Sequence, residues 1–497
     1  MALWAGPVVA FVLIFFYHPD IAHPEIGYTL AIAAWMAIWW ITEPVPLAIT
    51  SLLPVVLFPL LSIMDGQTVS SAYFNHVIFL FIGGFLIALA MQRWDLHKRI
   101  ALNILNITGI GKSKLLLGFM LATALLSMWM SNTATAMMIV PILMSVLAEI
   151  EPEPAKKKSF STGLLLGVAY SASIGGIMTL VGTPPNLSFL RIYQVMFPHA
   201  PAITFLQWML FAVPTGILLL AAAFSLLFLR YAKGSETNQA AKDLPIRQMK
   251  KDLGPMSREE KIVLICFLLM ALLWITRSDI GIGMTTIKGW ASLFGKPAFI
   301  NDGTVAIALS LPLFMIPAKG QAGSWIMDWE TASHLPWDIV LLFGGGFALA
   351  NGFRDSGLSL WLGGQLEGIS VLPPVIIILI ICLLVTFLTE LTSNTATTEM
   401  ILPVLAGMAI ATHTHPLFFM VPATLSASMA FMLPAATPPN AIIFGTRRVT
   451  ILEMARTGFW LNLIGAVIIT AVFYFIGSAV FKINPGEFPV WAVQSVK

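Results

Sequence analysis

Charge is what this chain of 497 residues has least of. Asp, Glu, Lys and Arg make up 10% of it, whereas apolar residues make up 58%. Soluble domains carry about 25% charged residues, so the chain lacks the charge to cover a water-facing surface of ordinary size. The net charge is only +3, and no basic helix or arm is present, so nucleic acid is not an expected partner. The composition predicts a protein that lies in a lipid bilayer.

Cysteine and enzyme motifs are scarce as well. Cys266 and Cys382 lie inside apolar runs, where a small packing role is commoner than a disulfide or a metal site. The run Gly111-Lys112-Ser113 ends like a phosphate-binding loop, but that motif requires Gly at the position of Asn106. We find neither a cluster of catalytic or metal-binding residues nor a continuous polar pore. The sequence therefore favours neither an enzyme nor a channel.

Long apolar runs are what the chain has instead. Runs of roughly 20 residues between polar, Pro or Gly positions are typical of helices that cross a bilayer. They predict an all-α polytopic membrane protein with about 11 transmembrane helices. The predicted helices cover residues 2–17, 27–41, 45–63, 75–92, 161–181, 204–230, 260–276, 301–317, 337–352, 416–436 and 453–481. A cleaved leader would need a basic segment before the first run, so we expect that run to remain as a span.

Two more apolar stretches, 115–150 and 371–412, are each about twice as long as one crossing. A Ser-Asn-Thr sequence interrupts each of them near its middle. We interpret both as re-entrant hairpins, which enter the bilayer and return to the side they came from. Because non-helical backbone at membrane depth is tolerated only inside protein or along a cavity, each interruption marks a candidate binding site.

The distribution of positive charge supports this topology. With the N-terminus cytoplasmic and both hairpins returning to their own side, the C-terminus lies outside and 20 of the 27 Lys and Arg residues lie inside. The other seven are Arg191, Arg277, Lys288, Lys296, Arg354, Lys482 and Lys497. Such an excess is the positive-inside pattern of membrane proteins. We expect an integral protein of a bacterial inner membrane, with residues 231–260 as a cytoplasmic linker between two halves.

Repeated motifs relate the two halves. The sequences GGF and SNTAT and a proline each recur 262 positions later, and GTPPN is answered by ATPPN 254 positions later. The pairs are 83–85 with 345–347, 131–135 with 393–397, 141 with 403, and 182–186 with 436–440. Under the predicted topology the first hairpin opens inside and the second outside, so the repeats are inverted, as in many secondary transporters.

The chemistry of the repeated motifs favours an ion-coupled anion site. Ser, Asn and Thr both donate and accept hydrogen bonds, and the half-helices that they cap have positive N-terminal ends that favour an anion. Carbonyl and hydroxyl oxygens suit a hard cation such as sodium. A single such cluster would be an ordinary helix cap. Neither hairpin and neither Pro-Pro break contains Lys or Arg, so co-bound cations would have to balance an anion there.

Two acidic residues, Glu390 and Glu399, flank the second Ser-Asn-Thr sequence. A carboxyl group at membrane depth is a functional candidate. The sequence leaves two roles open for Glu390: direct coupling to an ion, or a structural role as a protonated or hydrogen-bonded group.

These motifs resemble those of the divalent anion/sodium symporter family, whose members carry dicarboxylates, citrate or sulfate. The likeness rests on the paired hairpins and on the run from Ser393 through TATTEMILPVLAG to MLPAATPPNAIIFGTRRV, and it extends over residues 27–480. It implies a homodimer in which a fixed scaffold and a moving transport domain work as an elevator. The implied parts are 1–110 (scaffold) and 111–230 (transport, with hairpin 115–150 and broken helix 161–197), the linker 231–260, then 261–365 (scaffold) and 366–497 (transport, with hairpin 371–412 and broken helix 416–446).

The resemblance also implies which residues bind sodium and substrate. The two sodium sites would be formed by Ser127, Ser131, Asn132 and Gly182 in the first repeat and by Thr389, Thr392, Asn394 and Ala436 in the second. The substrate carboxylates would meet Asn132, Thr133, Ser393, Asn394, Thr395, Thr437 and Pro438.

The intact Ser-Asn-Thr sequences resemble the carboxylate-carrying branch of the family more than the sulfate branch. The presence of Ser127, Gly182 and Thr389 favours symport. We therefore predict sodium-coupled transport of a C4 dicarboxylate such as succinate, malate or fumarate. Two alternatives stay open, namely a sodium-independent exchanger of dicarboxylates or 2-oxo acids, and a sodium symporter of sulfate.

Overall fold

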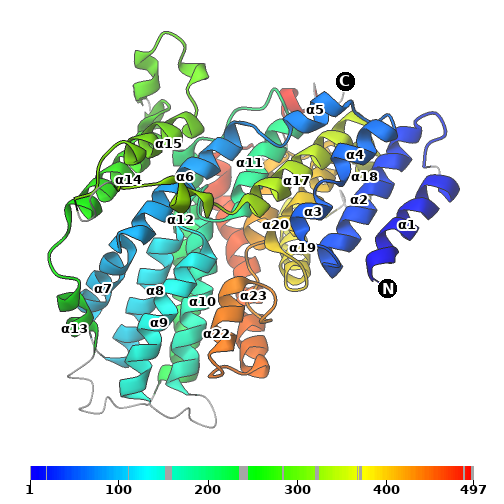
Figure 1. Ribbon diagram of the computed structural model, residues 1–497. Coiled ribbons are helices and arrows are strands. Elements are labelled where there is room, and N and C mark those ends of the chain that lie inside the picture. The colour runs from blue at the N-terminus through cyan, green and yellow to red at the C-terminus, as the bar shows by residue number, and fades with distance from the viewer. Residues whose placement is uncertain are drawn as a thin grey trace.

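In the computed structural model the chain is built almost wholly of helices, which pack side by side (Figure 1). The structure describes residues 2–17, 19–109, 111–151, 159–233, 245–282, 285–319, 324–366, 368, 372–484 and 487–493. Residues 234–244 of the predicted linker and residue 371 at the start of the second predicted hairpin lie outside this set.

Five helices precede the first repeated motif. They are α1 (Ala2–Phe16), α2 (Pro24–Thr42), α3 (Leu47–Thr50), α4 (Leu53–Leu60) and α5 (Gly66–Ser71). The prediction of one continuous helix over 45–63 was wrong, because the chain turns between α3 and α4. Pro54 in the first turn of α4 has no N–H to continue a helix. In the turn, the carbonyl of Ser51 accepts a hydrogen bond from Tyr73 Oη at 2.5 Å.

The first repeat forms seven helices. They are α6 (His76–Arg93), α7 (Leu96–Thr108), α8 (Lys112–Ser127), α9 (Asn132–Ile150), α10 (Phe160–Ile177), α11 (Pro184–Met196) and α12 (Phe205–Leu227), which a π turn at Phe228–Ala232 extends. Helix α7 was not predicted, because only one face of it is apolar and buried. The stretch 115–150 forms two helices, α8 and α9, which pack on each other and are separated by a break before Asn132, and its re-entrant course stays a prediction.

The second repeat follows the same order. Its helices are α17 (Trp337–Asp355), α18 (Leu358–Gln365), α19 (Pro374–Thr389), α20 (Asn394–Ala411), α21 (Leu417–Ser426), α22 (Pro438–Gly445) and α23 (Ile451–Val472), which a π turn at Phe473–Gly477 extends. Helices α10 and α21 each pack on both limbs of their own hairpin and on the last helix of their repeat. The halves also interlock, since α11 packs on α20 and α22 packs on α9.

Among the described residues, six helices are long and apolar enough to cross a membrane. They are Pro24–Thr42, Gly66–Arg93, Asn132–Ile150, Phe160–Ile177, Phe205–Ala232 and Ile451–Val480, and five shorter apolar helices accompany them. The span Phe160–Ile177 is 100% buried, whereas Phe205–Ala232 and Ile451–Val480 are 39% buried. An apolar helix that is buried all round belongs to the protein core, whereas half-exposed ones are suited to face lipid. Helix α10 is therefore the central helix of the first repeat, and the count of eleven crossings stays a prediction.

The remaining elements connect the repeats and end the chain. They are α13 (Pro245–Asp252), α14 (Arg258–Thr276), the antiparallel strands β1 (Ile280–Ile282) and β2 (Thr285–Ile287), the short 3-10 turns Trp290–Leu293, Pro297–Phe299 and Leu311–Phe314, α15 (Asp302–Ser310), α16 (Trp329–Ser333), α24 (Ser478–Val480) and α25 (Val490–Val493). Helix α15 packs on α14 and on α6, which attaches this region to the first repeat.

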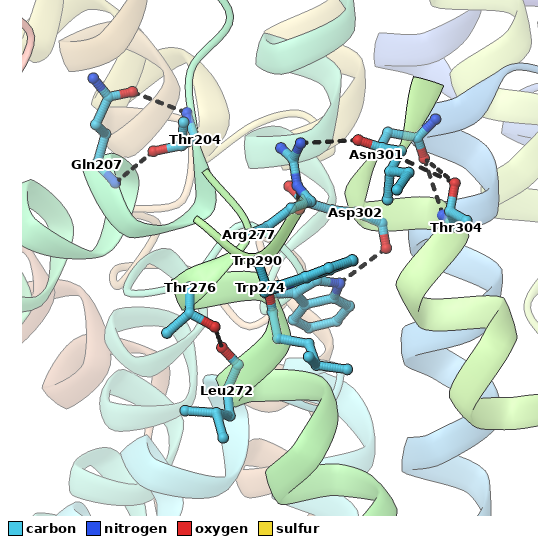
Figure 2. A network of polar contacts seen from close by, with 12 residues as sticks. Thr204, Gln207, Leu272, Trp274, Thr276, Arg277, Trp290, Asn301, Asp302 and Thr304 are labelled. Atoms are coloured by element: carbon cyan, nitrogen blue, oxygen red, sulfur yellow. Dashed lines mark hydrogen bonds and ion pairs between the residues drawn. The ribbon is translucent and has the colours of Figure 1, made fainter. Parts of the chain in front are cut away.

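Figure 2 shows the polar network that joins α14 to α15. Arg277 Nε lies 2.5 Å from Asp302 Oδ1, and Arg277 Nη1 donates to the carbonyl of Ile300 at 3.0 Å. Trp274 Nε1 donates to the carbonyl of Asp302 at 2.9 Å. The Arg277 and Asp302 side chains are only 18% and 10% exposed, so this pair is largely out of water.

We expect Arg277→Met to destabilise the protein, because it leaves the Asp302 carboxylate almost buried without its counter-charge. Removing one partner of a buried pair costs about 3–5 kcal/mol. Thermal unfolding of the detergent-purified protein measures the effect. The double variant Arg277→Met/Asp302→Asn should regain part of the loss, and Lys288→Met should change little, because its pair with Asp279 is exposed. Equal melting temperatures for Arg277→Met and Lys288→Met would contradict this.

Candidate functional site

The tips of the two hairpins have nearly the same backbone geometry. Ser131 precedes α9 with φ −60° and ψ 145°, and Ser393 precedes α20 with φ −62° and ψ 135°. Asn132 and Asn394 are therefore the first residues of their helices, as the break predicted in each hairpin requires. Both tips place a helix N-terminus, with its unpaired N–H groups, at the break.

A matching hydroxyl group braces each tip. Ser127 Oγ lies 2.7 Å from both Asn132 Oδ1 and the carbonyl oxygen of Ala172. Thr389 Oγ1 lies 2.8 Å from both Asn394 Oδ1 and the carbonyl oxygen of Ala427. A hydroxyl has one proton to donate, so in each repeat at least one of the two acceptor oxygens has no proton from it. Each cluster therefore has three close oxygens but only one proton between them. An oxygen that receives no proton is free to coordinate a hard cation.

The broken helices also match. Thr183 before α11 and Thr437 before α22 are both extended, with φ −148° and −142°. Asn186 Nδ2 donates to the carbonyl of Thr179 at 2.7 Å, and Asn440 Nδ2 donates to that of Leu433 at 3.0 Å. These amides hold the unwound backbone that precedes each Pro-Pro pair. Sequence reasoning did not assign them a role, although both stand at the end of the repeated motif.

Backbone carbonyls converge on Gly182. A Cβ added there would lie 2.5 Å from the oxygen of Gly176 and 2.9 Å from the oxygens of Ser127 and Met128. The absence of a side chain thus leaves room among three acceptor oxygens from the hairpin and the broken helix. Ala436 holds the matching position in the second repeat and carries a Cβ, so the two predicted sodium sites are not equivalent.

The remaining predicted sodium ligands differ in how free their side chains are. Ser131 Oγ accepts a hydrogen bond from the N–H of Ala134 at 3.2 Å. The Thr392 hydroxyl is bonded to that of Thr397 and to the carbonyl of Leu388 at 3.1 Å. A cation at Thr392 would therefore meet its backbone oxygen rather than its hydroxyl.

The predicted substrate residues lie on both hairpin tips and on the second break. Asn132, Thr133, Ser393 and Asn394 are partly exposed, and Pro438 is exposed. Thr395 and Thr437 are buried, and the Thr437 hydroxyl caps α22 by accepting from the N–H of Asn440 at 3.4 Å. Helix α22, which follows the second break, packs on α9, which follows the first tip. Four helix N-termini, those of α9, α11, α20 and α22, begin at the repeated motifs.

Of the two roles left open for Glu390, the structure supports the hydrogen-bonded one. Its carboxyl accepts hydrogen bonds from the N–H groups of Phe431, Met432 and Leu433 at 2.7, 2.9 and 3.1 Å, and from Asn462 Nδ2 at 2.7 Å. These donors belong to the second break and to α23. Glu390 thereby holds the unwound backbone of the second broken helix.

The chain matches the family described as sodium:sulfate symporter transmembrane region over residues 2–482. It is 45% identical over 496 residues to the sodium-dependent dicarboxylate transporter SdcS of Staphylococcus aureus (strain bovine RF122 / ET3-1). It is 43% identical over 492 residues to SdcS of Staphylococcus saprophyticus, and each alignment covers 97% of this chain and 92% of the relative. The chain therefore belongs to this family of integral membrane transporters, which confirms the family predicted from the motifs.

Two solved structures share the fold. The YdaH transporter of Alcanivorax borkumensis superimposes with a TM-score of 0.57 at 13% identity, over 93% of this chain and 99% of that one. The MtrF protein of Neisseria gonorrhoeae superimposes with a TM-score of 0.56 at 13% identity, over 94% and 96%. At this identity the likeness bears on the fold alone, and it supports the predicted all-helical architecture.

We expect Gly182→Ala to raise the sodium concentration for half-maximal transport several-fold, because the new methyl group would occupy the space among three carbonyl oxygens. Sodium titration of uptake into proteoliposomes measures this. The matched control is Gly364→Ala, since a Cβ there meets nothing within 4 Å and Ala suits a helix better than Gly. An unchanged sodium dependence in Gly182→Ala would remove this oxygen cluster from consideration as a cation site.

Proposed function

We propose that this protein is a sodium-coupled symporter of C4 dicarboxylates such as succinate, malate and fumarate in a bacterial inner membrane. The observation that carries the proposal is the matching pair of hairpin tips. In each tip a hydroxyl group, that of Ser127 or of Thr389, has one proton to donate but lies within hydrogen-bond distance of two acceptor oxygens. The relationship to sodium-dependent dicarboxylate transporters along nearly the whole chain favours dicarboxylate over sulfate. The reaction is translocation, with no chemical step for a catalytic residue.

Two sodium ions would bind at the breaks. The first would meet Ser127, Ser131, Asn132 and Gly182, and the second Thr389, Thr392, Asn394 and Ala436. Support comes from the acceptor oxygens at both tips that receive no proton from Ser127 or Thr389, and from the carbonyl cluster beside Gly182. Oxygen ligands are those that hard cations prefer.

The dianion would bind between the tips. Its carboxylates would be met by hydroxyl and amide groups of Asn132, Thr133, Ser393, Asn394 and Thr395 and by the start of α22 at Thr437 and Pro438. The N-terminal ends of helices favour negative charge. Because no Lys or Arg lies in either hairpin, the two sodium ions supply the balancing charge, and this makes substrate binding depend on sodium.

Transport would proceed by an elevator movement of the hairpins and broken helices along a scaffold of the remaining helices. The surfaces that would slide are those of α11 and α20 against α6 and α17. Few polar contacts cross this boundary: Arg354 Nη1 of α17 donates to the carbonyl of Val195 at 2.8 Å, and the side chains of His76 and Gln194 are hydrogen-bonded. Inverted repeats of this kind are typical of alternating access. A cytoplasmic N-terminus, an outer C-terminus and a homodimer are parts of the same proposal.

Succinate uptake into proteoliposomes tests the function. We expect concentrative uptake into empty vesicles under an inward sodium gradient, and none when potassium or choline replaces sodium. Uptake confined to vesicles preloaded with succinate and indifferent to sodium would establish an exchanger instead. Strong competition by sulfate would identify the sulfate alternative.

The site variants give a separate test. Thr133→Ala and Thr395→Ala should raise the KM for succinate. Asn132→Ala and Asn394→Ala should lower transport further, because each asparagine serves both ion and substrate. Wild-type kinetics in both asparagine variants would show that the site lies elsewhere.

Cross-linking tests the elevator movement. In a background with Cys266→Ala and Cys382→Ala, the pair His76→Cys/Gln194→Cys joins α6 to α11, and a short bifunctional thiol reagent should stop transport by fixing the two units together. The pair Asp279→Cys/Lys288→Cys, which replaces an ion pair between the residues that flank β1 and β2, should cross-link without loss of transport. Full activity in the cross-linked His76/Gln194 pair would rule out sliding at this boundary.

A further inference from the structure

Glu399 is a fully buried carboxyl group with one hydrogen-bond partner. It lies on α20, and its Oε1 accepts a hydrogen bond from the hydroxyl of Ser188 on α11, which is buried too. Its other oxygen, Oε2, is buried and has no partner among the described residues. Oε2 lies against Gly346 of α17, where an added Cβ would collide with it. The carboxyl group therefore fills the space that a glycine of the neighbouring helix leaves open.

The surroundings of Glu399 suit the neutral acid and not the carboxylate. Burying a carboxylate is unfavourable unless a counter-charge or several donors replace the lost water. Within the described ranges Glu399 has a single hydroxyl donor and forms no ion pair. Glu390 has four donors nine positions earlier on the same hairpin. The two acidic residues beside the second tip are thus held in opposite ways.

Neighbouring charges do not alter this conclusion. Helix α20 packs on α2, α11, α17, α18, α19 and α21. The charged or thiol side chains of these helices are Glu25, Arg191, Asp338, Arg354, Asp355 and Cys382. None of these six faces Glu399 in the described structure, where Ser188 is the side chain that interacts with it. This environment therefore favours the protonated, neutral form of Glu399.

The two oxygens of Glu399 belong to different sides of the proposed sliding boundary. Ser188 holds Oε1 within the hairpin and broken-helix unit, whereas Gly346 covers Oε2 from the scaffold side. Movement of α20 along α17 would uncover Oε2 and leave the contact with Ser188 in place. Water at Oε2 would then stabilise the carboxylate.

We infer that Glu399 is a proton-binding site whose occupancy is linked to the position of the hairpin and broken-helix unit relative to the scaffold. This inference rests on the proposed elevator function. The carboxyl group holds its proton while α20 is packed on α17, and it loses the proton to water when sliding exposes Oε2. Return to the packed arrangement takes a proton back. High pH should therefore disfavour the packed arrangement and slow the transport cycle.

The pH profile of uptake tests this inference. Fumarate is the substrate of choice, because its own carboxylates stay ionised throughout the range from about pH 6 to about pH 9. We expect sodium-driven uptake by the wild type to fall several-fold across this range. Glu399→Gln mimics the neutral acid and should keep the activity that the wild type has at about pH 6, with little dependence on pH. Glu149→Gln, on the exposed part of α9, should keep the wild-type profile.

Ser188→Ala supplies a second variant that retains the carboxyl group. Losing the hydroxyl donor disfavours the carboxylate, so the fall in uptake should move to higher pH. The inference is overturned by a flat wild-type profile, by an unaltered fall in Glu399→Gln, or by an unshifted fall in Ser188→Ala.

Cross-linking of His76→Cys/Gln194→Cys separates this inference from the proposed function, because it requires no transport. The cross-linking rate should decline with rising pH relative to the same pair carrying Glu399→Gln. Absence of sodium-driven uptake at every pH would contradict the proposed function alone. Equal pH dependence of cross-linking in both backgrounds would overturn the role of Glu399 even in an active transporter.

Discussion

The structure depends on one constraint: a helix that unwinds inside a bilayer must find new partners for its N–H and carbonyl groups. This chain unwinds at four places, two hairpin tips and two Pro-Pro breaks, and each is repaired by side chains. Asn186 and Asn440 donate to backbone carbonyls of the breaks, and Glu390 accepts from three N–H groups of the second break. Without these contacts the breaks would be unfavourable, and the helices α9, α11, α20 and α22 would not begin where they do.

The proposed ion sites follow from the same constraint. Proline removes N–H donors and leaves carbonyl oxygens, so a Pro-Pro break creates more acceptors than donors. The tips add to this excess, because Ser127 and Thr389 each bring one proton to two further oxygens. Side chains relieve part of the excess, and the remainder attracts a cation. Coupling of a dianion to sodium then needs no Lys or Arg at the site, which agrees with their absence from both hairpins.

The features that the sequence predicted are those encoded locally. Hairpin length and the Ser-Asn-Thr interruptions were enough to predict α8–α9 and α19–α20, and the positions of Pro-Pro predicted where α11 and α22 begin. The turn that divides 45–63 into two helices is bonded to Tyr73, which lies outside that run. The partner of Glu399 is Ser188, on another repeat and 211 positions away. No periodicity relates these two residues, so their contact could only be seen in three dimensions.

The two repeats differ in ways that the packing explains. The second break, residues 427–437, is longer than the first, residues 178–183, and therefore leaves more N–H groups unpaired. At the tip position where the first repeat has Met128, the second has Glu390. In the first repeat the backbone oxygen of Met128 accepts a hydrogen bond from the hydroxyl of Thr179, which ties the shorter break to the tip. In the second, a carboxylate reaches three N–H groups at once. The longer break is thus bonded to an acid at one flank of the tip, whereas Glu399 at the other flank meets a single donor and Gly346. Two carboxyl groups on one hairpin can then differ in protonation, because unwound backbone surrounds the first and packed helices surround the second.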